Sequence, residues 1–436
     1  MAMTEHEGLQ IYKDASGNSF ILYPITKARL VDGLEEFVDD KVSIPLGHVS
    51  AKNNPHDVTA EQLGIDLTQL NAASVVPGGY GALVLNCVDE NGAPVSGCVV
   101  RIGEELAVTG VNGVAKFFLT PGSYSVTIVS PIDYGAEAQT KSVTVALSEA
   151  VYIEAIIQDS LGGATEADIT GSVTAAFSDR VVSADAFGVG GGGSGGCAVN
   201  TSSSQFGASA AGGAGGKTKT VKNLNPMDLF VVTIGTGGVA RTFSSTNAQN
   251  GAAGGTTEIK TSAGIVVLSA PGGEGGKGGI TSSILGVSGA AGGSGSGGAV
   301  GRYEGSGINA GESGEDGASG KSVAYSPNTY AGGAGQGTTT RAFGEENGEL
   351  FASAGASVGA YSSLTPALGT PGEGAGHAAG GALAKNGSAI AGNGETPGSG
   401  GGAVAVVNAS NVYSTLTVKS GAGANGLVRF RWEVSA

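Results

Sequence analysis

The sequence contains few of the residues from which catalytic, metal and membrane sites are built. Its 436 residues include three cysteines, four histidines and one tryptophan. The cysteines, Cys87, Cys98 and Cys197, lack metal-ligand spacing, and their odd number fits a protein made in a reducing cytosol. No run approaches the 18 apolar residues of a membrane span, and the N-terminus has neither the basic nor the apolar region of a signal peptide. We therefore expect cytoplasmic synthesis without a signal peptide and no membrane insertion.

Positive charge is also scarce. The chain has a net charge of −15, all of it in residues 1–187, where 9 Lys and Arg face 24 Asp and Glu. Residues 188–436 contain 13 of each sign. Phosphate backbones require clustered Lys and Arg. Nucleic acid is therefore not expected as a partner.

Glycine is abundant and unevenly distributed. Of the 81 glycines, 18 lie in residues 1–187 and 63 in residues 188–436. Proline does not rise with glycine and no strict Gly-X-Y period is present, which argues against a collagen rod. The change in composition predicts a separate C-terminal domain over residues 188–436.

Glycine recurs every third residue within this domain, for example at Gly272, Gly275 and Gly278, with similar series from Gly292 and from Gly311 to Gly320. A polyglycine-II helix has three residues per turn and no internal hydrogen bonds, so it must bond to neighbouring chains. The blocks are too short and too regularly separated by apolar runs for a flexible Gly/Ser linker. We predict packed polyglycine-II-type helices together with β-strands.

The last strand of this domain is predicted at residues 427–434, LVRFRWEV. Val428, Phe430, Trp432 and Val434 alternate with charged residues, as in a half-buried strand. Trp432, the single tryptophan, is expected to be a core anchor and not a ligand platform.

The sequence of the N-terminal half indicates three further segments, each with its own expected structure. Residues 1–76 contain a hairpin over 9–23 and two short helices, one of them with capping-box spacing at Thr59 and Gln62. Residues 77–158 contain about seven short strands, typical of a β-sandwich. Cys87 and Cys98 could face each other there, although buried free thiols are favoured. Residues 159–187 are predicted as a linker. The expected architecture is thus mainly β, elongated and multidomain.

Three stretches resemble known families. The run IYKDASGNSFILYPITKARLVDGLEE, with GHVSAKNNPHDVTAEQLGI, resembles the N-terminal region of tail-fibre proteins of phages that infect Gram-positive gut bacteria. That resemblance implies a homotrimer attached to other virion tail or baseplate proteins. The run VDENGAPVSGCVVRIG is similar to carboxypeptidase-regulatory-like, Ig-type modules, which serve as spacers or bind proteins.

The C-terminal half resembles the glycine-rich domains of phage fibres and receptor-binding adhesins. The motifs are the opening Gly190–Gly196, the strand end Thr233–Gly238, the run Ser269–Gly276 and the turn before Leu427. In such proteins polyglycine helices form the body, and loops between them contact a bacterial surface carbohydrate or protein receptor.

The glycine-poor stretch of residues 322–369 is the place where we expect binding. Exposed aromatic and amide side chains suit carbohydrate or protein contacts, although aromatics could instead fill gaps between glycine helices. The predicted receptor-binding residues are Tyr325, Asn328, Tyr330, Phe343, Phe351 and Tyr361.

No catalytic, metal or cofactor site is expected. A hydrolase of polysaccharide would need paired carboxylates in a cleft, whereas two clusters, Glu312 with Glu315 and Asp316 and Glu345 with Glu346 and Glu349, lie in hydrophilic turns. His48 and His56 are read as turn residues. The sequence therefore predicts a non-enzymatic virion fibre, made in the host cytoplasm, that binds the host surface. The alternatives are a purely structural neck, collar or head fibre and a bacterial surface adhesin.

Overall fold

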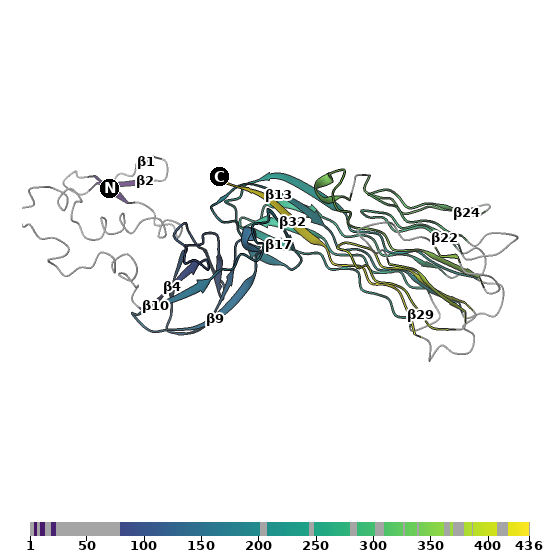
Figure 1. The fold of residues 1–436 in the computed structure, drawn as a ribbon, viewed down its shortest axis with the longest axis horizontal. Coiled ribbons are helices and arrows are strands. Elements are labelled where there is room, and N and C mark those ends of the chain that lie inside the picture. The colour runs from purple at the N-terminus through teal and green to yellow at the C-terminus, as the bar shows by residue number, and fades with distance from the viewer. Residues whose placement is uncertain are drawn as a thin grey trace, which may run out of the picture. The chain divides into compact units, whose positions relative to one another are not determined.

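The computed structural model is built of β-strands, with two short 3-10 helices among the described residues (Figure 1). It groups into two compact units, one of Met1–Val84, Phe117–Gly122 and Val145–Val151, the other of Leu85–Lys116, Ser123–Thr144 and Tyr152–Ala436. Within the described part there is no helix with the length and apolar character of a membrane span. The described residues are 4–6, 9–13, 19–22, 79–200, 207–243, 248–279, 286–300, 309–325, 328–337, 340–361, 367–368, 379–385, 387–407 and 417–435.

The predicted N-terminal hairpin is confirmed. Strands β1 (Thr4–His6), β2 (Leu9–Lys13) and β3 (Ser19–Leu22) form an antiparallel sheet, and Tyr12 pairs with Phe20 across the hairpin. The helices expected elsewhere in residues 1–76 lie outside the described residues.

Residues 79–157 contain the seven strands that the sequence predicts, and we call them the seven-strand domain. One sheet has the order β10-β4-β7 and the other the order β6-β5-β8-β9. Cys87 and Cys98 are buried free thiols, and a hydrogen bond to Cys87 together with burial raises the pKa of Cys98. The strands are β4 (Gly81–Val88), β5 (Val99–Ile102), β6 (Glu105–Val108), β7 (Val114–Leu119), β8 (Gly122–Val129), β9 (Ala138–Val145) and β10 (Ala150–Ile156).

The predicted linker at residues 159–187 is wrong, because most of it folds into the C-terminal domain. Strands β11 (Glu166–Ile169), β12 (Val173–Ala175) and β13 (Val181–Val189) occupy it. They pair with strands far along the chain: β11 and β13 flank β32 (Leu427–Val434), and β12 pairs with β17 (Phe230–Thr233). The domain therefore begins about twenty residues before the first glycine block.

Two four-stranded sheets enclose the main core of this glycine-rich domain. Their orders are β11-β32-β13-β16 and β12-β17-β18-β19. Phe430 and Trp432 are buried between them, which confirms the predicted anchor, whereas Val434 is 45% exposed. The remaining strands of these sheets are β16 (Thr218–Leu224), β18 (Thr257–Thr261) and β19 (Val266–Ala270).

The first glycine block, residues 190–196, forms a central segment bonded to neighbours on all sides. Every third N–H donates to the same neighbouring segment: Gly190, Gly193 and Gly196 donate to the carbonyls of residues 217, 214 and 211 at 2.9 Å. The other N–H groups donate to residues 252–255 and 421–424, and the carbonyls accept from residues 273–276, 401–404 and Gly238. Six neighbours around a three-residue repeat are the packing expected of polyglycine-II helices.

This packing leaves no space for side chains at the inward positions. A Cβ added to Gly272 or Gly275 would lie 2.1 or 2.2 Å from a carbonyl oxygen of residues 251–254, so the predicted inward face of that series is correct. The third residue of each repeat, Pro271, Glu274 or Lys277, is exposed. Gly317 departs from the expected series, because its φ of +80° places it in a turn.

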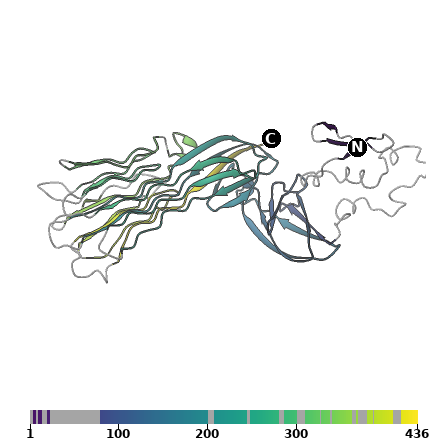
Figure 2. The same ribbon diagram turned by 180° about the vertical axis from the view of Figure 1, so that it is seen from behind.

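The glycine segments run side by side from these sheets to a second group of short strands (Figures 1 and 2). We call the end that carries this group the distal end. Its strands are β14 (Cys197–Val199), β15 (Gly207–Ala210), β20 (Gly278–Gly279), β21 (Gly286–Val287), β22 (Ala299–Val300), β23 (Asn309–Ala310), β24 (Val323–Tyr325), β25 (Asn328–Tyr330), β26 (Val358–Tyr361), β27 (Ala367–Leu368), β28 (Ala382–Lys385), β29 (Ala389–Ile390), β30 (Val404–Val407) and β31 (Val418–Lys419).

The glycine-rich domain is joined to the seven-strand domain through a buried carboxylate. Asp133, in the 3-10 helix η2 (Ile132–Tyr134), accepts hydrogen bonds from Arg180 Nε at 2.6 Å and from the Ser178 backbone and hydroxyl. The Arg180 guanidinium also stacks on Tyr134, with 4.3 Å between Cζ and the ring centroid. A buried charge is tolerated only when it is paired. Asp133 therefore fixes the position of Arg180, the residue directly before β13.

Candidate functional site

The hairpin β24-β25 carries three of the predicted binding residues, Tyr325, Asn328 and Tyr330. Val323 pairs with Tyr330 and is buried, which fixes the hairpin to the domain. Asn328 is exposed and Tyr330 is half-buried. The side chains of Tyr325 and Tyr361 lie outside the described residues, although the backbone of Tyr325 pairs with Asn328.

Tyr330 is seated on a glycine. A Cβ added at Gly286 in β21 would lie 2.2 Å from the Tyr330 ring, so only glycine leaves room for the ring there. The ring therefore contacts the chain at Gly286 and is half-buried. A rigid, half-exposed tyrosine loses little entropy when a ligand packs against it. The sequence pattern indicated Tyr330 but gave no sign of Gly286.

Phe343 and Phe351, by contrast, are core residues. They are 6% and 2% exposed and pack with Phe187 and Leu427, with ring centroids 5.9 and 5.5 Å from that of Phe187. Their expected contact with a receptor is therefore wrong. Phe343 and Phe351 instead fill a gap, which is the alternative stated above for aromatic residues of this stretch. They cover the second face of the sheet that contains β32.

Two arginines of β32 hold this covering segment in place. Arg429 donates to Asp168 at 2.6 and 2.8 Å and lies 3.0 Å from Glu349, and Arg431 donates to Glu166 and Glu345, each at 2.5 Å. Both guanidinium groups also lie over rings, Arg431 at 4.1 Å from the centroid of Phe343. Charged and aromatic contacts together fasten η3 (Ala342–Gly344) to the sheet.

The ion pair lowers the pKa of Glu345 below its ordinary value of 4.5, chiefly through its hydrogen bond to Arg431. Stabilisation by this carboxylate is complete above the ordinary pKa and is lost as the pH falls through the lower pKa of the folded state. We expect Glu345→Gln to lower Tm at pH 7, and the difference from wild type to close as the pH falls below 4.5. Glu346→Gln, a change at an exposed neighbour, is the control; equal pH dependence of both variants would contradict the assignment.

Two carboxylates of the other cluster are also paired. Glu312 is bonded to Lys321, and Asp316 lies 3.3 Å from Arg341. Within the described residues no group of three or more His, Cys, Asp or Glu side chains could hold a metal ion. His48, His56 and His377 lie outside the described residues.

Comparison with known proteins concerns mainly the glycine-rich domain. The family model described as "Glycine-rich domain" matches residues 167–433, a span that starts in β11 and ends in β32. No curated protein sequence matches the chain significantly.

Among solved structures, "The Bacillus anthracis TIE protein" is similar at 12% identity and a TM-score of 0.18. The match covers 54% of this chain and 48% of that one, so the chain spans about half the length of that protein. At this TM-score the two folds are not shown to be alike. The family match covers more than half of the chain, and the protein therefore belongs to the glycine-rich domain family.

Proposed function

We propose that the chain is a phage virion fibre protein that attaches to the tail by its N-terminal region and recognises the bacterial surface through the glycine-rich domain. The observation that carries this proposal is the six-neighbour bonding of residues 190–196. A backbone bonded on all sides makes a rigid scaffold with little interior space. Such a scaffold is suited to present its distal end to another surface, whereas catalysis requires a cleft.

The resemblances noted in the sequence extend the proposal to partners. The N-terminal region would contact other virion tail or baseplate proteins, the protein would be a homotrimer, and the seven-strand domain would be an Ig-type spacer or protein-binding unit. The receptor would be a bacterial surface carbohydrate or protein, contacted at the distal end by residues that include Asn328 and Tyr330. The protein would act without catalysis or cofactor, in the virion, after synthesis in the host cytoplasm.

Binding of the fluorescently labelled full-length chain to a panel of Gram-positive gut bacteria tests the recognition step. We expect at least one strain to bind the protein, and Asn328→Ala with Tyr330→Ala to reduce binding by about tenfold or more, as expected when a hot spot is removed. Glu274→Ala, a change at an exposed side chain of the scaffold, is the matched control. Binding to no strain, or equal binding by both variants, would contradict recognition through this hairpin.

A purely structural fibre is the second candidate, and the burial of Phe343 and Phe351 favours it, since it removes two expected contacts. Both candidates predict a homotrimer, and light scattering tests it. We expect a mass about three times the chain's 42.2 kDa. A monomer would contradict both. Immunogold labelling of virions then locates the protein on the tail or on the neck, collar or head.

A further inference from the structure

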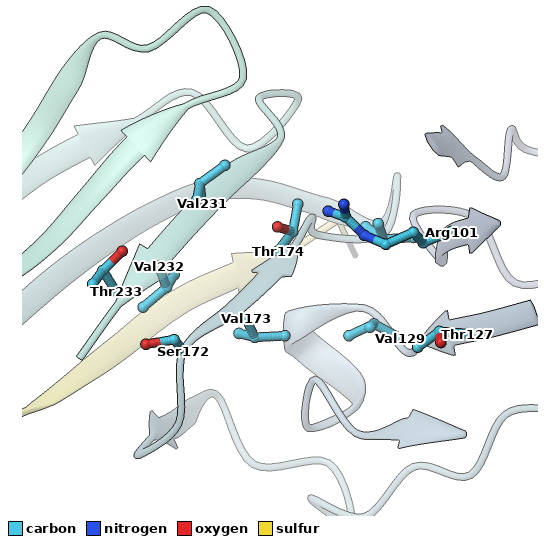
Figure 3. Close-up of a pocket in the computed structure, with 10 residues that line it drawn as sticks. Arg101, Thr127, Val129, Ser172, Val173, Thr174, Val231, Val232 and Thr233 are labelled. Atoms are coloured by element: carbon cyan, nitrogen blue, oxygen red, sulfur yellow. The ribbon is translucent and has the colours of Figure 1, made fainter. Parts of the chain in front are cut away.

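A pocket of about 330 Å³ lies between the seven-strand domain and the glycine-rich domain, within the larger compact unit (Figure 3). Cross-strand pairs form its walls. On one side Val99 pairs with Val129 and Arg101 with Thr127; on the other Val173 pairs with Val232 and Thr174 with Val231. The first wall is one face of its sheet. The second is formed by the edge strand β12 and its neighbour β17, whose adjacent residues point to opposite faces. The volume is at the lower end of that found for small-ligand sites.

The pocket has an apolar floor and a hydroxyl-bearing rim. Val173 and Val231 keep exposed surface in this floor, whereas Val99, Val129 and Val232 belong to the main core and are 8% exposed or less. Thr127, Ser172, Thr174 and Thr233 add hydroxyl groups to the lining. The Ser172 hydroxyl oxygen accepts a hydrogen bond from the Ile234 N–H at 3.0 Å, so its proton remains free to be donated. A rim that both donates and accepts, above an apolar floor, matches the hydroxyls and C–H face of a sugar ring.

Arg101 supplies the one cation of the lining. It is exposed, and its guanidinium extends toward Thr174 (Figure 3). Every other arginine in the described part of the chain donates to a carboxylate or a backbone carbonyl, whereas Arg101 has no such partner among the described residues. The donating arginines are Arg180, Arg241, Arg341, Arg429 and Arg431. A guanidinium that lacks a partner and faces a pocket is ready to take a carboxylate in bidentate geometry.

The surrounding charge makes this site selective. The seven-strand domain contains eight Asp and Glu and three Lys and Arg, so its general field disfavours small free anions. A ligand must therefore gain binding free energy from contacts with the floor and the rim as well as from its ion pair with Arg101. An extended peptide is less suited, because it would pair along the edge strand β12, and the Ala176 carbonyl at the end of that edge already accepts from the Ile132 N–H at 2.8 Å.

We propose that this pocket binds the ring of an acidic sugar, with the ring carboxylate on Arg101, the ring hydroxyls on Thr127, Ser172 and Thr174, and a C–H face on the valine floor. The inference goes beyond host recognition at the hairpin, since no residue is shared. It makes the junction of the two domains a second binding site, one for carbohydrate.

Saturation-transfer NMR of the full-length chain with D-glucuronate tests the site directly. We expect transfer to the sugar ring protons at millimolar concentration, at least tenfold weaker transfer to D-glucose, and loss of the glucuronate signal in Arg101→Gln. Arg241→Gln, at an arginine that donates to a backbone carbonyl elsewhere, should keep the signal, and so should Asn328→Ala with Tyr330→Ala. The last variant separates this site from the hairpin, so that either proposal can fail alone.

Four outcomes would overturn the assignment. They are an unchanged signal in Arg101→Gln, equal transfer to glucose, competition by acetate as effective as by glucuronate, and binding of an acidic extended peptide where glucuronate does not bind. Because Arg101 is exposed, its replacement should leave the fluorescence of Trp432 unchanged, and that measurement shows that a lost signal does not reflect unfolding.

Discussion

The glycine-rich domain is expected to lose its native packing when Gly193 is replaced by alanine. The added Cβ would lie 2.0 Å from the carbonyl oxygen of Glu274, a distance that no real contact tolerates. Relief would require residues 273–276 to move, yet Gly273 and Gly276 both donate to the central segment, and Gly276 also accepts from Gly251. The clash therefore cannot be relieved without breaking further hydrogen bonds.

We expect the cost of this substitution to be about 4 kcal/mol or more. Overpacking of a filled interior costs about 1–3 kcal/mol, and each buried polar group left without a partner adds about 1–3 kcal/mol. Guanidinium unfolding followed by the fluorescence of Trp432 measures it. This single tryptophan is 3% exposed in the core of the glycine-rich domain, so it reports on that domain alone.

Gly380→Ala is the matched control in the same domain. A Cβ at Gly380 would meet no atom of the described residues within 4 Å, and the residue needs no positive φ. Replacement should therefore leave stability unchanged or raise it by up to about 1 kcal/mol, because alanine restricts the unfolded chain. If the two variants lost the same stability, packing around the central segment would not be what makes glycine necessary.

The period of three in glycine was enough to predict polyglycine-II helices, because inward positions must lack a side chain wherever the helices touch. It could not predict which segments are neighbours. Residues 190–196 bond to segments as distant as 421–424, and glycine carries no side chain whose size or charge would distinguish one partner from another. The pairing is decided by the strands at both ends of each segment.

The start of the domain cannot be predicted from the sequence for a related reason. Six of the 13 apolar residues in 159–187 are alanine, so the local pattern indicates a linker. Their partners are Arg429 and Arg431, which bind Asp168 and Glu166 of β11 from more than 250 positions away. Since strand propensity depends on such context, no local signal could have identified β11.

Part of the candidate site could be predicted from the sequence. Aromatic residues in a glycine-poor stretch indicated residues 322–369, and Asn328 does lie exposed on the hairpin. The sequence does not show that both faces of the sheet around β32 are buried. Phe343 and Phe351 are therefore predicted at the surface, whereas they pack on the second face. The alternating arginines at 429 and 431 suggested solvent on that face, whereas their aliphatic stems and charges are covered by rings and carboxylates.

Truncation of Phe430 to alanine is expected to destabilise the glycine-rich domain by about 3–5 kcal/mol, the range for a fully buried phenylalanine. Phe430 is 0% exposed, and its ring lies 5.5 Å from that of Phe177 and 6.0 Å from that of Phe230. Phe230 lies in β17 and Phe430 in β32, which belong to different sheets, and Phe177 follows β12. The cavity would therefore loosen the contacts between the two sheets of the core.

Val434→Ala is the control for Phe430→Ala, because Val434 has the same alternation on β32 but is 45% exposed. Its loss should cost less than about 1 kcal/mol, in proportion to the small apolar area removed from contact. The two midpoints of guanidinium unfolding, followed at Trp432, should therefore differ clearly. If Phe430→Ala were as mild as Val434→Ala, the core of aromatic rings would not be what joins the C-terminal strand to β11 and β13, and the domain would be held by its glycine backbone bonds alone.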